Sequence, residues 1–249
     1  MEHAGYTAAV AGLRARVRAE LTAEIKALAR RQMAAQGAGS LSLRAITREL
    51  GMVSSAVYRY FPSRDHLLTA LIIDSYNEIG DLAEHADAIG DRNDLAGRWR
   101  RVSNAAFRWA KDNPAEYGLI FGTPIPGYAA PTDTIGPATR FTMVLIGLLE
   151  HAVALGARPA VTVEPGPAVQ ADLQRVRDDL GVDIDDGMLL AGMQVWMGLF
   201  GAISFILFGQ LNNVITDVDE YFAVTAEGLG RQVFDVTGTM ASGTDVERA

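Results

Sequence analysis

The chain has 249 residues, no Cys, and 30 acidic against 22 basic residues, which gives a net charge of -8. This length allows a large helical domain with a smaller one beside it. The lack of Cys excludes disulfides, thiolate metal sites and Cys nucleophiles, and Met1 to Gly12 do not follow the pattern of a secretory signal, so we expect a cytoplasmic protein.

The charges are distributed unevenly along the chain. Residues 1–68 contain ten basic and five acidic residues, which leaves twelve basic and twenty-five acidic residues for the other 181. A net negative charge argues against binding to phosphates. A short basic segment on an acidic body, however, is typical of proteins in which only the basic segment contacts DNA. The charge pattern therefore favours nucleic-acid binding by the amino-terminal quarter of the chain.

The first predicted element is an amphipathic helix that Gly37 and Gly39 end. Apolar residues recur in it at steps of three or four, and basic residues lie between them, so its outer face is cationic. The apolar residues are Leu13, Val17, Leu21, Ile25 and Leu28, and the basic residues are Arg14, Arg16, Arg18, Lys26, Arg30 and Arg31.

Two short helices are predicted next. Ser42 is placed to cap the first one, which Gly51 closes, and the second covers about residues 54–60, after which Ser63 caps a longer helix. Two short helices joined by a tight turn and braced by a longer one are typical of a helix-turn-helix, whose second helix enters the major groove of DNA. Helical hairpins without a DNA function share this pattern, so spacing alone leaves both interpretations open.

The segment Leu43–Leu68, LRAITRELGMVSSAVYRYFPSRDHLL, resembles the DNA-binding signature of the TetR (tetracycline-repressor) family, most closely over residues 57–65. Val53 and Ser54 depart from the signature, because the family more often has Ser followed by Lys or Pro there. The resemblance implies an all-α homodimer in which a three-helix DNA-binding domain precedes a helical bundle with a ligand pocket and the dimer interface.

The remaining chain is also predicted to be helical. Trp99, Val102, Ala106 and Trp109 share one face of a helix that ends before Pro114, and three prolines make residues 123–131 a loop. Further helices are expected over residues 141–155, 173–180, 188–209 and 212–234, with a Pro-rich connection over residues 156–167. The segments NPAEYGLIFGTPIPGYAAP and WMGLFG resemble the C-terminal domain of an actinobacterial branch of the family. That branch usually has His where Phe200 stands, so a ligand role of that His does not carry over.

Met188–Gly209 is a run of 22 residues without a charge, long enough to cross a bilayer. Asp185 and Asp186 at one end, and the lack of Lys or Arg after the other until Arg231, argue against a membrane span. We therefore expect the run to be buried by its own domain and by a second copy. The family resemblance implies that it forms, with residues 212–234, a four-helix dimer interface.

No sequence motif for a metal, a cofactor or catalysis is found. The acidic stretch from Asp178 to Asp186 fails the calcium-loop register, because Met188 and Gln194 stand where such a loop, counted from Asp183, needs Gly and Glu. The four His residues form no metal-binding pair, and phosphate-loop and nucleophile-elbow motifs are missing from the sequence. We expect neither a cofactor nor an enzyme.

Seven residues are candidates for contact with DNA: Ser42, Arg44, Ser54, Ser55, Tyr58, Arg59 and Arg64. Ser54 and Ser55 begin the second short helix and would face base edges. Arg59, one turn on, would form a bidentate contact to guanine or bind a phosphate, and both alternatives stay open. The resemblance implies phosphate contacts for Tyr58 and Arg64.

The effector is expected to be small and apolar, because aromatic and Met residues are abundant in the body. The candidates for its binding site are Trp99, Trp109, Tyr117, Phe121, Tyr128, Phe141, Met143, Met193, Trp196 and Phe200. Each of them is also a candidate for plain core packing.

The combined prediction is a ligand-responsive repressor that binds a palindromic operator as a homodimer and does not attach to a membrane. Its domains are expected at residues 1–68 for DNA binding and 69–236 for ligand binding and dimerisation, followed by a disordered tail at 237–249. Two alternatives remain: a helical-bundle enzyme, and a membrane-attached sensor with a structural N-terminal hairpin.

Overall fold

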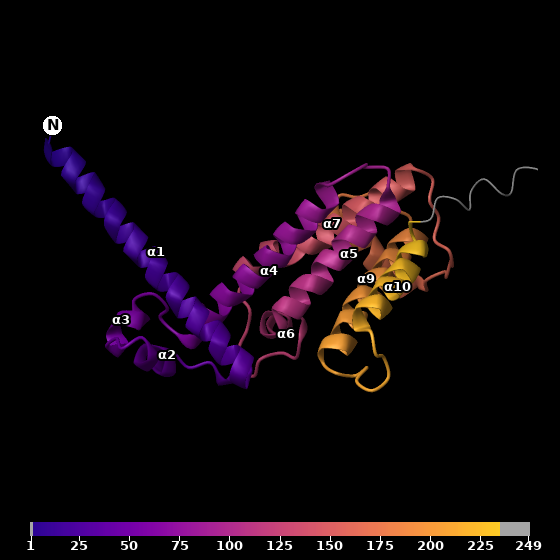
Figure 1. Ribbon diagram of the computed structural model, residues 1–249. Helices are drawn as coiled ribbons and strands as arrows, with labels where there is room; N and C mark the ends of the chain where they lie inside the picture. Colours follow the sequence, from indigo (N-terminus) through magenta and orange to yellow (C-terminus); the bar gives the residue numbers. More distant parts are fainter. Residues whose placement is uncertain (1, 235–249) are drawn as a thin grey trace, which may run out of the picture. The chain divides into compact units, whose positions relative to one another are not determined.

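The computed structural model describes the backbone of residues 2–234 and, apart from Ser54, the side chains from residue 12 onward in this range. The tail predicted at residues 237–249 lies outside the described residues. Every regular element in the described range is a helix, which confirms the all-α prediction (Figure 1). The α-helices are α1 (Glu2–Gln36), α2 (Leu43–Glu49), α3 (Ser54–Tyr58), α4 (Arg64–Ala88), α5 (Leu95–Asp112), α6 (Pro114–Phe121), α7 (Ile135–Ala154), α8 (Pro167–Leu180), α9 (Asp186–Leu207) and α10 (Val218–Arg231).

The chain divides into two compact units. Met1–Ser75 together with Asn113–Ile135 form the first unit, and Tyr76–Asp112 together with Gly136–Ala249 form the second. The first unit therefore contains α6 and the loop after it in addition to α1, α2, α3 and the first part of α4.

The core of the first unit is built on the carboxyl half of α1. Ile25, Leu28, Ala29 and Met33 are buried there, while α1 packs against α2 and α6. Gly37 ends α1 with a φ of 79°, a left-handed conformation that glycine adopts without strain. The predicted helix end is thus confirmed, and the chain turns back so that α2 and α3 lie beside α1 (Figure 1).

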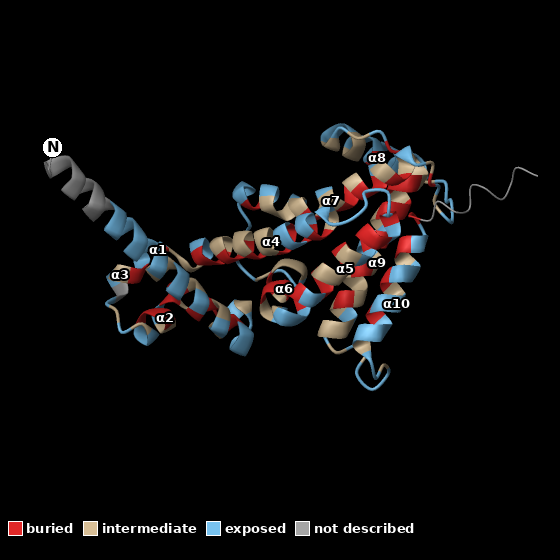
Figure 2. Ribbon diagram, turned by 45° about the horizontal axis from the view of Figure 1, so that its top comes forward, coloured by how far each residue is buried: buried red, intermediate tan, exposed pale blue. Residues whose placement is uncertain are grey.

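The core of the second unit lies where α5 packs against α9 and α10. The predicted face of α5 is confirmed, because Trp99, Val102, Ala106 and Trp109 are all buried. Figure 2 shows buried positions along α5. The helix expected from residue 212 begins only at Val218, because the side chain of Asp217 accepts hydrogen bonds from the backbone N–H groups of residues 219 and 220 and caps α10 there.

The apolar run of the sequence forms α9, which by length and composition could cross a membrane. One side of α9 is packed inside its own unit. A Cβ atom added to Gly192 would lie 2.3 Å from Cδ1 of Leu149 on α7, and one added to Gly198 would lie 2.6 Å from Cδ2 of Leu229 on α10. These two glycines therefore allow close packing within the chain, whereas a Cβ atom at Gly201 would meet no atom within 4 Å.

Candidate functional site

The first candidate site is the surface of α2 and α3. Hydrogen bonds of Ser42 and a buried apolar core fix the backbone of these helices. The hydroxyl of Ser42 accepts a hydrogen bond from Ala45 N at 3.3 Å, and Ser42 N donates to Gln32 Oε1 of α1 at 2.9 Å. Ile46 of α2 and Val57 of α3 are buried beneath this surface. The predicted N-cap is confirmed, and the same residue ties α2 to the first helix.

The other side of α2 and α3 faces away from this core. The side chains of Arg44, Ser55, Tyr58 and Arg59 are exposed there, and Ser42 is half-buried at the start of α2. The side chain of Ser54 lies outside the described part of the structure. Exposed guanidinium and hydroxyl groups on two adjacent short helices are suited to donate hydrogen bonds to phosphates and base edges.

Arg64, the seventh candidate, is partly used inside the protein. Its Nη2 atom donates to the carbonyl oxygens of Ala38 at 3.2 Å and Gly39 at 3.1 Å, and Nη1 lies 3.7 Å from a carboxylate oxygen of Asp65. Arg64 therefore fixes the turn after α1 at the start of α4. Its predicted phosphate contact remains a prediction.

An ionic cluster that sequence patterns did not indicate joins three helices of the first unit. Lys26 Nζ of α1 lies 2.7 Å from Asp74 Oδ2 of α4, and Arg30 lies 3.8 Å from the same oxygen. Arg30 Nε is also 3.7 Å from Oε1 of Glu116, a buried carboxylate in the first turn of α6. The loop after α6 is anchored as well, because Tyr128 Oη lies 2.9 Å from Thr69 Oγ1 of α4.

The residues predicted to bind ligand are divided between the two units. Tyr117, Phe121 and Tyr128 belong to the first unit, and the other seven belong to the second. Within the second unit the ring of Phe200 is edge-on to Phe141 at 5.2 Å and to Trp196 at 6.4 Å, so these three come together between α7 and α9.

Trp99 and Trp109 lie elsewhere in the second unit. The Nε1 atom of Trp99 donates to the carbonyl of Ala226 on α10 at 2.6 Å, whereas Nε1 of Trp109 lies 3.4 Å from Glu78 Oε2 on α4. Both indoles are buried, so each contributes to helix packing.

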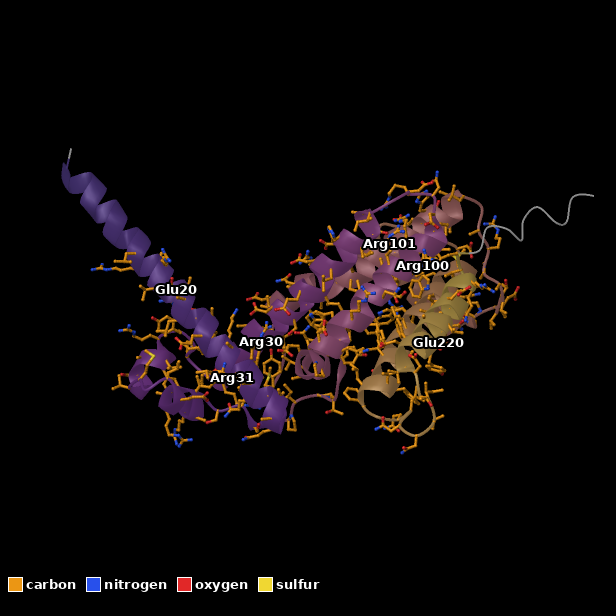
Figure 3. The ribbon with its side chains drawn as sticks, in the orientation of Figure 1. Glu20, Arg30, Arg31, Arg100, Arg101 and Glu220 are labelled. Carbon is orange, nitrogen blue, oxygen red and sulfur yellow. The ribbon has the colours of Figure 1, made fainter. Side chains whose placement is uncertain are left out.

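A groove with a volume of about 570 Å³ runs between α5 and α10 of the second unit. Trp99 is the one predicted ligand residue among those that line it. Figure 3 labels two charged residues of its lining, Arg100 of α5 and Glu220 of α10. The sequence did not predict this groove, because it forms between two helices that lie far apart in the sequence.

A buried arginine connects α4, α5 and α7. Only 1% of the Arg98 side chain is exposed, and its Nε and Nη2 atoms donate to the two carboxylate oxygens of Asp87 at 2.8 and 3.1 Å. Its Nη1 atom donates to Nδ1 of His151 at 2.8 Å, since an arginine can only donate. Burial raises the pKa of Asp87, but hydrogen bonds from Arg98 and Arg92 outweigh it and hold that pKa below its ordinary value of 3.8.

The described residues contain no group of His, Asp or Glu side chains that could hold a metal ion. The polar clusters in both units are ion pairs between oppositely charged side chains.

Two regions of the chain match models of known protein families. Residues 25–71 match the family model of bacterial regulatory proteins, tetR family, and residues 99–229 match the model of the tetracyclin repressor-like C-terminal domain. The HTH-type transcriptional regulators Rv1816 of Mycobacterium tuberculosis and Mb1846 of Mycobacterium bovis are each 40% identical to this chain over 214 residues, covering 83% of this chain and 89% of the relative. Because these relatives are transcriptional regulators, they decide against the helical-bundle enzyme.

Solved structures agree with this assignment. The regulatory protein SCO4313 is similar with a TM-score of 0.71 and 35% identity, over 86% of this chain and 97% of that chain. The TetR family transcriptional regulator PfmR from Thermus thermophilus has a TM-score of 0.55 at 17% identity, over 84% of this chain and 98% of that chain, and shows the fold alone. The helix-turn-helix resemblance is confirmed, and the chain belongs to the TetR family of transcriptional regulators.

Proposed function

We propose that this regulator is a homodimeric, cytoplasmic repressor that binds a palindromic operator through α2 and α3 and is released from it by a small apolar molecule. The observation that carries the DNA part is the exposed set of hydroxyl and guanidinium groups on two short helices with a common buried core. Residues 1–68 are the proposed DNA-binding domain, and residues 69–236 are the proposed ligand-binding and dimerisation domain.

In this proposal α3 lies in the major groove. Ser54 and Ser55 face base edges, and Arg59 donates two N–H groups to O6 and N7 of one guanine, a contact worth about 1 to 3 kcal/mol of discrimination. Tyr58 and Arg64 bind backbone phosphates, and Ser42 and Arg44 at the start of α2 contact a phosphate or a base edge.

The proposed dimer forms through α9 and α10. Met197, Gly201 and Phe205 follow each other at steps of four on α9, and 56% of Phe205 is exposed. Val224 and Gly228 are spaced in the same way on α10, with 65% of Val224 exposed. Apolar side chains beside glycines whose added Cβ atoms would meet no neighbour within 4 Å provide a surface that a second copy can approach closely.

The proposed effector is apolar because the ring cluster of Phe141, Trp196 and Phe200 offers aromatic faces. A ligand releases the repressor if it binds better to a dimer whose two α3 helices are at the wrong separation for DNA. Met143, Met193 and the remaining predicted aromatic residues stay candidates for lining or for core.

The test begins with a genomic selection for DNA fragments that the purified protein retains. Fluorescence anisotropy then measures its affinity for a selected duplex and for a scrambled duplex of the same length, with and without a panel of apolar compounds. The proposal expects a preference of about a thousandfold for the selected duplex, weakened by at least one compound. Equal affinity for both duplexes contradicts DNA recognition, and indifference to every compound leaves a repressor without the proposed release.

A further inference from the structure

The amino-terminal part of α1 extends beyond the core of its unit. Residues 12–20 are helical and every one of them is exposed, including Leu13 at 62% and Val17 at 50%. The first buried side chain of α1 in the described range is Ile25, which is also where the match to the family model begins. Figure 1 shows this part of the helix running on past α2 and α3. We call residues 12–20 the arm.

The arm carries a cationic stripe on the side of α1 that is buried further along. Arg14 and Arg18 are four residues apart, and Ile25 is seven residues after Arg18, so all three lie on one face of the helix. Where α1 extends beyond the buried core of its unit, this face changes from apolar to basic. Arg16 is on the other side and pairs with Glu20 at 2.9 Å, near the label of Glu20 in Figure 3.

The stripe begins next to α3. The guanidinium carbon of Arg18 lies 5.2 Å from the ring centroid of Tyr60, two residues after the end of α3. Arg14 is one turn further along, which is about 6 Å for a rise of 1.5 Å per residue. Arg14 is exposed and has no ion-pair partner in the part of the chain that the structure describes.

From this placement we propose that the arm binds backbone phosphates of the DNA that flanks the sequence read by α3. Double-stranded DNA carries one negative charge for about every 1.7 Å of its axis. Phosphates are therefore spaced densely enough along the duplex for Arg14 and Arg18, about 6 Å apart along the helix axis, each to contact one. A second copy of the chain is the less suitable occupant, because only Leu13 and Val17 would provide apolar contact and arginines on both copies would repel each other.

The inference rests on the proposed function, since it needs a duplex that α3 recognises. The arm supplies affinity without sequence preference, because phosphates are the same at every base pair. It also lengthens the stretch of DNA that each half of the dimer covers.

The test is the salt dependence of operator affinity for the double variant R14A/R18A. Each phosphate contact contributes about 0.9 to the slope of log affinity against log salt concentration, and a bound dimer carries two arms with two arginines each, so we expect the slope to fall by about 3.6 while the preference for operator over scrambled DNA is kept. The matched controls are R16A, on the other side of the arm, and R108A/R175A, which removes two exposed arginines of the second unit. Both controls should keep the wild-type slope.

A second measurement needs no variant and covers the case in which the double variant does not fold. Wild-type protein is titrated with operators whose flanks are trimmed stepwise, and we expect the affinity to fall at least tenfold when the flanking phosphates are removed. A wild-type slope in R14A/R18A, or equal affinity for trimmed and untrimmed duplexes, overturns the inference while operator recognition stands. Loss of dimers in R14A/R18A shows that the arm joins two copies and also overturns it, and failure of the wild type to bind any duplex overturns the proposed function itself.

Discussion

Arg59 lies directly after α3 and has two chemically different roles open to it. A bidentate contact to guanine depends on the base, whereas a contact to a phosphate does not. The residue is exposed at the end of the short helix, so its removal leaves the buried core of α2 and α3 intact.

We expect R59A to lose about 1 to 3 kcal/mol of binding free energy on the selected operator and little on scrambled DNA. Anisotropy titrations on both duplexes measure this difference, and R108A, an exposed arginine of α5, is the control. An equal loss on both duplexes assigns Arg59 to a phosphate instead.

The ion pair of Asp87 with Arg98 predicts a dependence of stability on pH in the second unit. The pKa of its carboxyl is lowered in the folded state, since the arginine hydrogen bonds outweigh the effect of burial. A lowered pKa means that the ionised carboxylate stabilises the fold above the pKa of the unfolded chain, about 3.9. That stabilisation is lost as the pH falls through the lower folded-state pKa.

The variant D87N leaves the buried guanidinium of Arg98 without its charge partner. We expect it to lower the free energy of unfolding at pH 7 by about 3 kcal/mol, because the guanidinium of Arg98 stays buried without a negative charge to compensate it. Urea unfolding at several pH values measures the effect, with D112N, an exposed carboxylate of α5, as the control. The gap between wild type and D87N should begin to narrow as the pH falls below about 4, and a gap that does not change with pH contradicts this account.

At the scale of single helices, local sequence signals identified the end of α1, the starts of α2, α3 and α4, and the end of α5, whereas α7 and α8, expected from residues 141 and 173, begin at residues 135 and 167. Ser42, Gly51, Ser63 and Pro114 each act through their own side chain or backbone conformation, so each position is readable without knowledge of the fold. The start of α10 was predicted too early. Val214 continues the apolar pattern, yet it lies in the turns before the Asp217 cap and is exposed.

The exposed faces of α9 and α10 lead to a prediction about assembly. The variant F205D places a carboxylate at the carboxyl end of the apolar stripe on α9, where a second copy would have to desolvate it. We expect the wild type to sediment as a dimer and F205D as a monomer in analytical ultracentrifugation.

The control for this experiment is V161D, which adds the same charge at an exposed position between α7 and α8. It should remain dimeric. A dimer in F205D with an unchanged dissociation constant shows that the copies meet through another surface.

At the scale of the whole molecule, the sequence predicted the fold class, and it could not predict which helix faces meet. Periodicity shows that a side of a helix is buried, as for Trp99 and Trp109, but both residues pack against α10 or α4 by contacts far apart in the sequence. The same limit applies to α6, whose Glu116 pairs with Arg30 of α1 across more than eighty residues of chain. The candidate DNA residues were readable because they lie on one continuous local motif.

In the proposed complex, two copies of the α2 and α3 surface bind one palindromic duplex. The most direct measurement is a titration, with stoichiometry, of a symmetric operator against the same duplex with one half-site scrambled. The account predicts two chains on each symmetric duplex and an affinity at least about a hundredfold lower for the altered one, since each mismatched base pair costs about 1 to 3 kcal/mol. One chain on each duplex, with equal affinity for both, would contradict it.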